Sequence, residues 1–186
     1  TEEQLITLRA ETPGKVIVEG TSYLHLGGKY LTVDGLYFRN GHSPKSAVIQ
    51  YRIGKDSTAN HCRVTNTVID GFTKPSRLTN DRWIVFYGKH NQLDHCYITG
   101  KSNDGETVRV FFTGNEHVNA HHQIVNNYFG PRPRKGGPRA ETVRVGDSKT
   151  RFAPGYVNVS NNYFEACNGE VEIISDKTMF NNYKNN

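Results

Sequence analysis

The chain of 186 residues lacks the features that mark several large classes of protein. No apolar run approaches the roughly 20 residues needed to cross a bilayer, and the polar, acidic first residues do not resemble a signal peptide. The three cysteines, Cys62, Cys96 and Cys167, are odd in number and fit neither a disulfide framework nor a zinc site. We therefore expect no membrane partner, and we interpret the cysteines as small buried core residues.

The sequence also lacks the signatures of a nucleic-acid-binding protein. The formal charge is +5 and the isoelectric point is near 9.1, a mild bias toward anionic partners. No recognition helix or aromatic RNA-binding signature accompanies this charge, so we do not predict a nucleic acid partner. An acidic polysaccharide suits the same charge.

A short unit that recurs five times, and then begins a sixth time, dominates what is present. Its anchor residues are spaced by 29 to 35 residues, and each copy is too short and too rich in β-branched and aromatic residues for a helix. A strand returning at this interval is typical of a parallel β-helix, whose successive turns stack about 4.8 Å apart. The copies are Val33–Phe38, Val64–Ile69, Leu93–Ile98, Ile124–Phe129 and Val159–Phe164, with the sixth at Met179–Lys184.

We predict an all-β fold, a parallel β-helix of about six rungs that forms a single domain over residues 1–186. Both ends look cut, because the strand-like Leu5–Leu8 begins at once and the sixth copy stops near the last residue. Solenoids need capped ends, so we expect an N-terminal cap and C-terminal rungs to be missing. One core column should contain the five anchors Val33, Val64, Leu93, Ile124 and Val159.

Each repeat strand is followed by a loop and a second predicted strand. Two of these second strands are near copies, Gly105–Val110 and Ala140–Val145, and a further one is predicted at Glu170–Ile174. Alternation predicts an inward set of Val108, Val110, Val143, Val145, Val171 and Ile173. It predicts two outward columns, one of Thr107, Thr142 and Glu170, the other of Arg109, Arg144 and Glu172.

Glu170 and Glu172 would then lie on one face, roughly 7 Å apart along the strand and beside an arginine. Carboxylates this close repel unless a cation lies between them, and Ca²⁺ takes carboxylate oxygens. The segment 130–139 carries four positive charges and suits the rim of a groove for polyanions. A surface salt-bridge ladder, an exposed Glu-x-Glu pair and an ordinary charged loop are the alternatives.

The segment Asn168–Lys177 resembles the Asn-Gly-x-x-Glu-Ile-Ile-Ser-x-Lys signature of polysaccharide lyase family 6, the alginate lyases and chondroitinase B. Three further stretches, Ile6–Gly14, Asn127–Pro133 and Glu141–Gly146, resemble segments of that family in the same order. The resemblance implies a right-handed parallel β-helix that cleaves uronic acid polymers by β-elimination. It also implies a secreted or periplasmic location.

Residue by residue, the resemblance assigns Glu170 and Glu172 as Ca²⁺ ligands and Lys177 as the catalytic base. Arg144 matches a basic residue beside the substrate carboxylate. Pro138 stands where the family has an asparagine ligand and has no side-chain oxygen, so we expect weak or absent Ca²⁺ binding. The family's catalytic arginine would follow Lys177 by about one rung. No arginine follows Lys177 here, so we expect this chain alone to be inactive.

We predict a polysaccharide lyase whose partner is an anionic, uronate-containing polysaccharide, with alginate as the preferred substrate. Besides Arg144, we expect Arg132 and Arg109 to bind the substrate. A chondroitin or dermatan sulfate lyase, a β-helical glycoside hydrolase and a non-catalytic polysaccharide-binding solenoid remain the alternatives. Ultraviolet absorbance of an unsaturated product separates elimination from hydrolysis and from binding alone.

Overall fold

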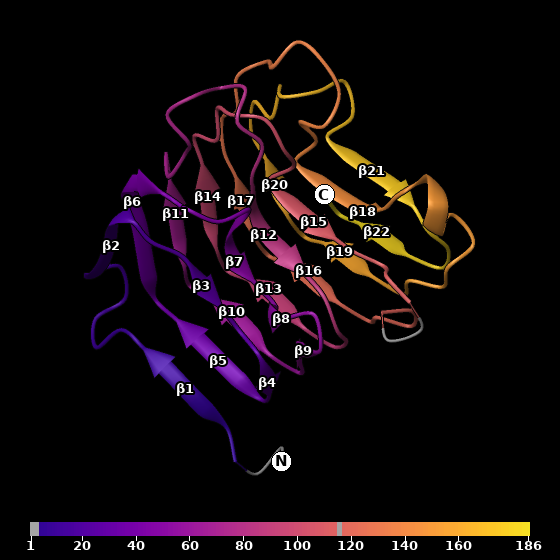
Figure 1. Ribbon diagram of the computed structural model, residues 1–186, viewed down its shortest axis with the longest axis horizontal. Helices are drawn as coiled ribbons and strands as arrows, with labels where there is room; N and C mark the ends of the chain where they lie inside the picture. Colours follow the sequence, from indigo (N-terminus) through magenta and orange to yellow (C-terminus); the bar gives the residue numbers. More distant parts are fainter. Residues whose placement is uncertain (1–3, 115–116) are drawn as a thin grey trace.

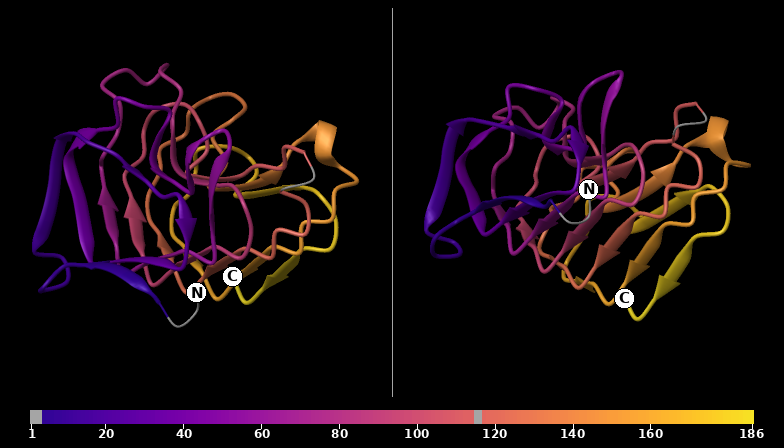
Figure 2. Two further views of the ribbon diagram at one scale, coloured as in Figure 1. Left: turned by 60° about the horizontal axis from the view of Figure 1, so that its bottom comes forward. Right: turned by 90° about the horizontal axis from the view of Figure 1, so that it is seen from below.

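The computed structural model describes residues 4–114 and 117–186, which wind into a parallel β-helix with three principal sheets. Successive rungs lie side by side from the indigo N-terminal end to the yellow C-terminal end (Figures 1 and 2). In this part of the chain the one helical element is the 3₁₀ turn η1 (Ser148–Thr150). None of the described residues forms a helix long and apolar enough to cross a membrane. The predicted all-β, right-handed parallel β-helix is confirmed.

The first sheet, sheet A, contains one strand of every rung, and all of its pairings are parallel. Its strands are β1 (Ile6–Arg9), β5 (Leu31–Asp34), β10 (Arg63–Thr65), β13 (Gln92–Asp94), β16 (Gln123–Val125), β19 (Asn158–Ser160) and β22 (Asn182–Lys184).

The second sheet, sheet B, follows sheet A after a tight turn of one or two residues in the rungs from β5 to β19. Its strands are β2 (Val16–Thr21), β6 (Leu36–His42), β11 (Val68–Asp70), β14 (Tyr97–Thr99), β17 (Tyr128–Phe129) and β20 (Tyr163–Phe164).

The third sheet, sheet C, completes the rung and carries the charged residues singled out in the sequence. Its strands are β3 (Leu24–His25), β7 (Ala47–Gln50), β12 (Arg82–Phe86), β15 (Val108–Val110), β18 (Val143–Gly146) and β21 (Ile174–Lys177). A small fourth sheet contains β4 (Gly28–Lys29), β8 (Arg52–Gly54) and β9 (Ser57–Asn60).

The recurring sequence unit is two short strands joined by a turn, where the sequence suggested one strand. The turn residue of each copy has a positive φ, between 49° and 84°, which Gly and Asn adopt more readily than other residues. This left-handed residue redirects the chain from sheet A to sheet B. The positions are Gly35, Asn66, His95, Asn126 and Asn161, and Asn185 repeats the conformation in the sixth rung.

The predicted core column is confirmed. Val33, Val64, Leu93, Ile124 and Val159 are direct register partners in sheet A, and each is at most 2% exposed. The column extends to Leu8 at one end and Tyr183 at the other. The three cysteines are buried and unpaired, as expected.

The sixth copy is present, but its predicted alignment was wrong by four residues. Val159 pairs with Tyr183, not with Met179. The amide of Asn186 hydrogen-bonds the backbone N–H of Asn162 at 3.2 Å, as the amide of Asn162 does for Asn127. In the sixth copy, the residues equivalent to Asn161 and Asn162 are therefore 185–186 and not 181–182, because buried side-chain amides must continue the same hydrogen-bonded ladder.

Candidate active site

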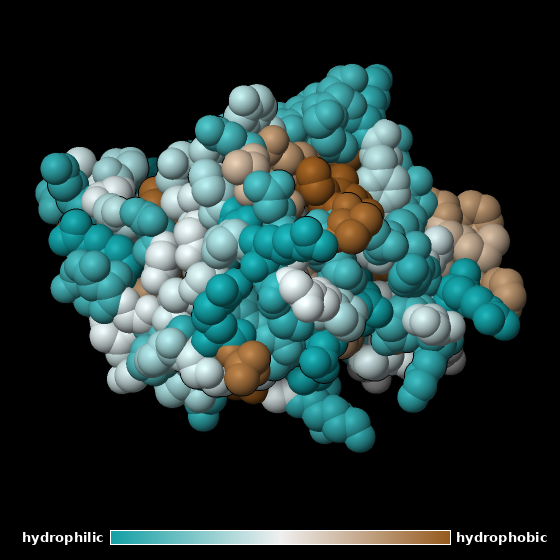
Figure 3. All heavy atoms as spheres, turned by 90° about the horizontal axis from the view of Figure 1, so that it is seen from above, coloured by the Kyte–Doolittle hydropathy of each residue, from teal (hydrophilic) through white to brown (hydrophobic). Residues whose placement is uncertain are grey.

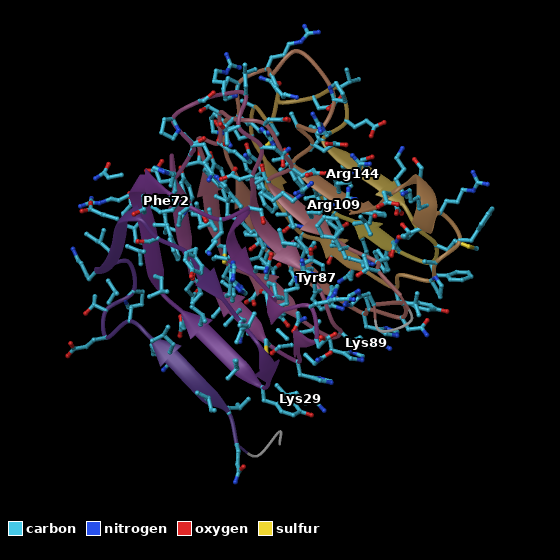
Figure 4. The ribbon with its side chains drawn as sticks, viewed as in Figure 1. Lys29, Phe72, Tyr87, Lys89, Arg109 and Arg144 are labelled. Atoms are coloured by element: carbon cyan, nitrogen blue, oxygen red, sulfur yellow. The ribbon has the colours of Figure 1, made fainter. Side chains whose placement is uncertain are left out.

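The outer face of sheet C brings together three of the six residues predicted for the site, Arg109, Arg144 and Lys177. Arg109 and Arg144 are direct register partners on β15 and β18, and both alternate with valines that are fully buried in the core. Figure 4 shows the two arginines side by side above sheet C, with Tyr87 farther along the same face. The predicted pairing of Arg109 with Arg144 is confirmed.

The next rung differs from the prediction. Arg144 pairs with Ser175, and Gly146 pairs with Lys177, because strand β21 begins at Ile174 and not at Glu170. The predicted columns were therefore wrong at Glu170 and Glu172, which precede the strand. Val171 and Ile173 are 93% and 41% exposed, so their predicted inward orientation was also wrong.

Lys177 consequently lies on the same face of sheet C as Arg144. Ser175 is the register partner of Arg144 and lies two residues before Lys177. Side chains two residues apart on a strand share a face, so Ser175 and Lys177 are on the face of Arg144. Lys177 is half-buried at the end of β21. Its partner in register is Gly146, so no bulky side chain from the preceding rung lies directly beside it.

Two glutamates, neither of them predicted as site residues, organise the arginines. Glu106 contacts Arg109 (Oε1 to Nη1, 3.2 Å), and Glu141 contacts Arg144 (Oε1 to Nη1, 3.2 Å). Burial raises the pKa of Glu141 and lowers that of Arg109. The near-identical stretches Glu-Thr-Val-Arg at 106–109 and 141–144 contain both pairs, so this duplication was the available signal.

Arg109 is 4% exposed and is paired with Glu106 and Asp147, so it is not open to substrate as predicted. Arg132 likewise does not lie in the groove, contrary to the prediction that it binds substrate. It is 3% exposed, and its Nη atoms donate to the Thr107 hydroxyl and to the carbonyls of Asn103, Gly105 and Glu141. Burial lowers its pKa to about 10. Arg132 thus fixes the loops that lead into β15 and β18, and the sequence could not distinguish this role from a surface one.

The remaining positive charges of the basic loop are largely paired within the protein. Lys135 contacts Asp104 (Nζ to Oδ1, 2.8 Å), and Arg139 contacts the other oxygen of Asp104 at 3.3 Å. Figure 3 looks onto this loop-bearing end of the molecule, which is mainly hydrophilic. Arg134 lines a hollow of about 860 Å³. The other lining residues are Gly136, Gly137, Pro138, Asn168, Gly169, Glu170 and Val171.

Several oxygens around this hollow already have partners within the protein. Oε2 of Glu170 already accepts a hydrogen bond from the Ala140 N–H at 3.1 Å, and Glu172 is exposed ahead of β21. The carbonyl oxygen of Pro138 accepts from Nζ of Lys135 at 2.8 Å, so a cation is already present at that carbonyl. Within residues 4–114 and 117–186, no three His, Cys, Asp or Glu side chains are grouped so as to hold a metal.

Comparison with solved structures places the fold among polysaccharide lyases. The PL6 family alginate lyase AlyGC is 47% identical, with a TM-score of 0.94, over 96% of this chain and 24% of that one. A mannuronic-acid-specific family 6 lyase from human gut microbiota is 32% identical, with a TM-score of 0.93, over 97% of this chain and 41% of that one. The family 6 lyase Pedsa3628 from Pseudopedobacter saltans is 29% identical, with a TM-score of 0.87 and coverages of 98% and 41%.

The chondroitinase B family model matches residues 1–186, and the chain therefore belongs to this family, polysaccharide lyase family 6. No curated protein matches the chain. The chain spans about a quarter to two fifths of the length of these solved structures.

Proposed function

We propose that this chain carries the substrate groove and the catalytic base of a lyase that cleaves alginate by β-elimination. The observation that carries the proposal is the register of β18 and β21, which places Lys177 on the face of sheet C that presents Arg144. The alginate lyases among the similar solved structures support the choice of substrate. A secreted or periplasmic location follows from the same proposal, since the polymer is extracellular.

The reaction requires removal of the proton α to a uronate carboxylate. In the proposed step, Nζ of Lys177 takes this proton from C5, the electron pair forms the C4–C5 double bond, and the bond from C4 to the glycosidic oxygen breaks. The developing negative charge needs a cation beside the carboxylate, and Arg144 supplies it. The leaving oxygen takes a proton from a donor that the resemblance places one rung beyond Lys177.

We propose that Arg144 neutralises the substrate carboxylate without a metal, because Pro138 has no side-chain oxygen and its carbonyl already accepts from Nζ of Lys135. Calorimetric titration of the protein with CaCl₂ should show no binding, and a chelator should leave activity unchanged. Pro138→Asn restores a side-chain oxygen and should introduce measurable Ca²⁺ binding, whereas Pro133→Asn in the same loop should not. Tight Ca²⁺ binding by the wild-type protein would overturn the proposal.

The reaction class is tested with the full-length protein and a panel of polymers. Absorbance of the unsaturated product should rise with alginate and stay flat with dermatan sulfate. A rise with dermatan sulfate alone would favour the second candidate substrate. Binding of alginate without any rise would favour a non-catalytic solenoid. Arg144→Ala should raise KM and lower kcat together, since the arginine contacts the carboxylate in the ground and transition states alike.

A further inference from the structure

The buried carboxylate of Glu106 lies between arginines from three consecutive rungs of sheet C. Its Oε2 contacts Nε of Arg82 at 2.8 Å, and its Oε1 contacts Nη1 of Arg109 at 3.2 Å and Nη1 of Arg144 at 3.7 Å. The Glu106 side chain is 2% exposed, so these contacts are shielded from solvent. One carboxylate thus bridges the rungs of β12, β15 and β18.

The three guanidinium groups are close enough to repel one another. Burial lowers the pKa of Arg109, the charge of Glu106 raises it, and the positive charges of Arg144 and Arg82 lower it further. Burying several like charges is costly unless an opposite charge lies between them. Without the Glu106 carboxylate, Arg144 would keep its contact with Glu141 at 3.2 Å but would face the unscreened charge of Arg109.

The contacts leave part of each arginine unused. Nε of Arg109 and Nε of Arg144 are buried and have no hydrogen-bond partner among the described residues, and the same holds for Oγ of Ser175. Arg109, Arg144 and Ser175 occupy the same position in three successive strands. Glu106 and Glu141 both contact Nη1 of Arg144, whose side chain is 19% exposed on the face of sheet C that also presents Lys177.

We propose that Glu106 is a positioning residue, which holds Arg144 in the orientation that binds the uronate carboxylate and neutralises the buried Arg109 beside it. This inference rests on the proposed lyase function and adds to it a residue that acts through the arginines. Positioning and overall charge predict opposite changes in substrate affinity when the charge of Glu106 is removed. Removing a negative charge from a groove for polyanions should tighten binding if only the overall field matters, whereas loss of positioning should weaken it.

The test uses Glu106→Gln, which keeps the shape of the side chain and removes its charge. Affinity for a uronate oligosaccharide is measured by calorimetry in full-length protein that carries Lys177→Ala, so that no turnover occurs. We expect Kd to rise about tenfold, and KM to rise similarly in the active background. Glu165→Gln is the matched control, because Glu165 is exposed and its carboxylate accepts a hydrogen bond from the Tyr128 hydroxyl. This control should leave Kd unchanged or slightly lower.

A double-mutant cycle with Arg144→Ala separates positioning from a general structural role. If Glu106 acts through Arg144, then Glu106→Gln should change Kd far less in the Arg144→Ala background than in the parent. Equal effects in both backgrounds would overturn the inference, as would an unchanged or lower Kd for Glu106→Gln alone. If circular dichroism shows that Glu106→Gln does not fold, Glu106→Asp takes its place with the same criteria. A parent that neither binds oligosaccharide nor forms unsaturated product would overturn the proposed function itself, and the inference with it.

Discussion

The inner and outer faces of sheet C both contain buried side chains, but those on the inner face are apolar and those on the outer face include paired charges. On the inner face, Val108, Val110, Val143 and Val145 are fully buried and pack into one apolar core. On the outer face, Arg109 and Glu106 are 4% and 1% exposed, and they are covered by each other and by neighbouring charged and aromatic side chains.

The difference shows that burial on this sheet has two sources. Apolar burial removes hydrocarbon from water and stabilises the fold directly. Burial of the paired charges costs desolvation that the ion pairs offset, so its value lies in fixed geometry. The inner face should therefore govern stability and the outer face should govern function. Four predictions, with activity measured in the full-length protein, test this division.

The largest expected effect is on catalysis, at Lys177. Lys177→Ala should reduce formation of the unsaturated product by roughly 10³-fold, since a positioned base contributes about 10²–10⁴-fold. The melting temperature and the oligosaccharide affinity should hardly change, because the side chain is half-buried at a strand end. A variant with activity close to wild type would show that another group removes the proton.

The next largest effect is on stability, at the inner face. Ile84 on β12 is fully buried and pairs with Val108 in register. Ile84→Ala should lower the free energy of unfolding by about 2–5 kcal/mol, as measured by urea denaturation. The KM of the folded variant should stay near that of wild type. A large change in KM with little loss of stability would contradict the division between the faces.

A smaller effect concerns acid stability at the inner face. His122 is fully buried, packs against Phe86 with ring centroids 4.9 Å apart, and accepts the Asn91 N–H at Nδ1. Burial lowers its pKa to about 3, from an ordinary value of 6.5. The unfolded chain therefore binds a proton that the folded chain excludes, and stability should fall as the pH drops from 6.5 toward 3.

His122→Asn should reduce this loss of stability at low pH, because asparagine does not titrate. The hydrogen bond should be kept, since asparagines at positions 91 and 181 accept equivalent backbone N–H groups. Melting temperatures of both proteins between pH 4 and 8 provide the measurement. Parallel curves for the two proteins would show that His122 is not responsible.

The smallest effect has the opposite sign and lies on the outer face. Burial raises the pKa of Glu141 above its ordinary value of 4.5, so the folded state retains this proton longer than the unfolded chain. Proton binding by Glu141 stabilises the folded state fully below pH 4.5, and this stabilisation is lost as the pH rises through the raised pKa of Glu141. The melting temperature of Glu141→Gln should therefore gain on that of wild type as the pH rises above 4.5. A gain toward lower pH would refute this assignment.

Which features were predictable depended on whether neighbouring rungs repeat. The core column from Val33 to Val159 was predicted correctly, because the same apolar anchor returns in every copy. The sixth copy was misplaced by four residues, and the register of strand β21 was misplaced by three. At those positions the local pattern offered two acceptable alignments, and only pairing with the preceding rung selects one.

The sequence by itself determined the parallel β-helix, the register of Arg109 with Arg144, and the family resemblance of the Lys177 segment. These depend on alternation and repetition, which are properties of the chain taken in order. Only the tertiary structure decided that Arg132 is buried and donates hydrogen bonds to backbone carbonyls. The same holds for the contact of Glu106 with three arginines and for the hydrogen bond that the Pro138 carbonyl accepts from Lys135. Each of these depends on which side chains from different rungs share a buried space. Residue order does not specify that until the rungs are stacked.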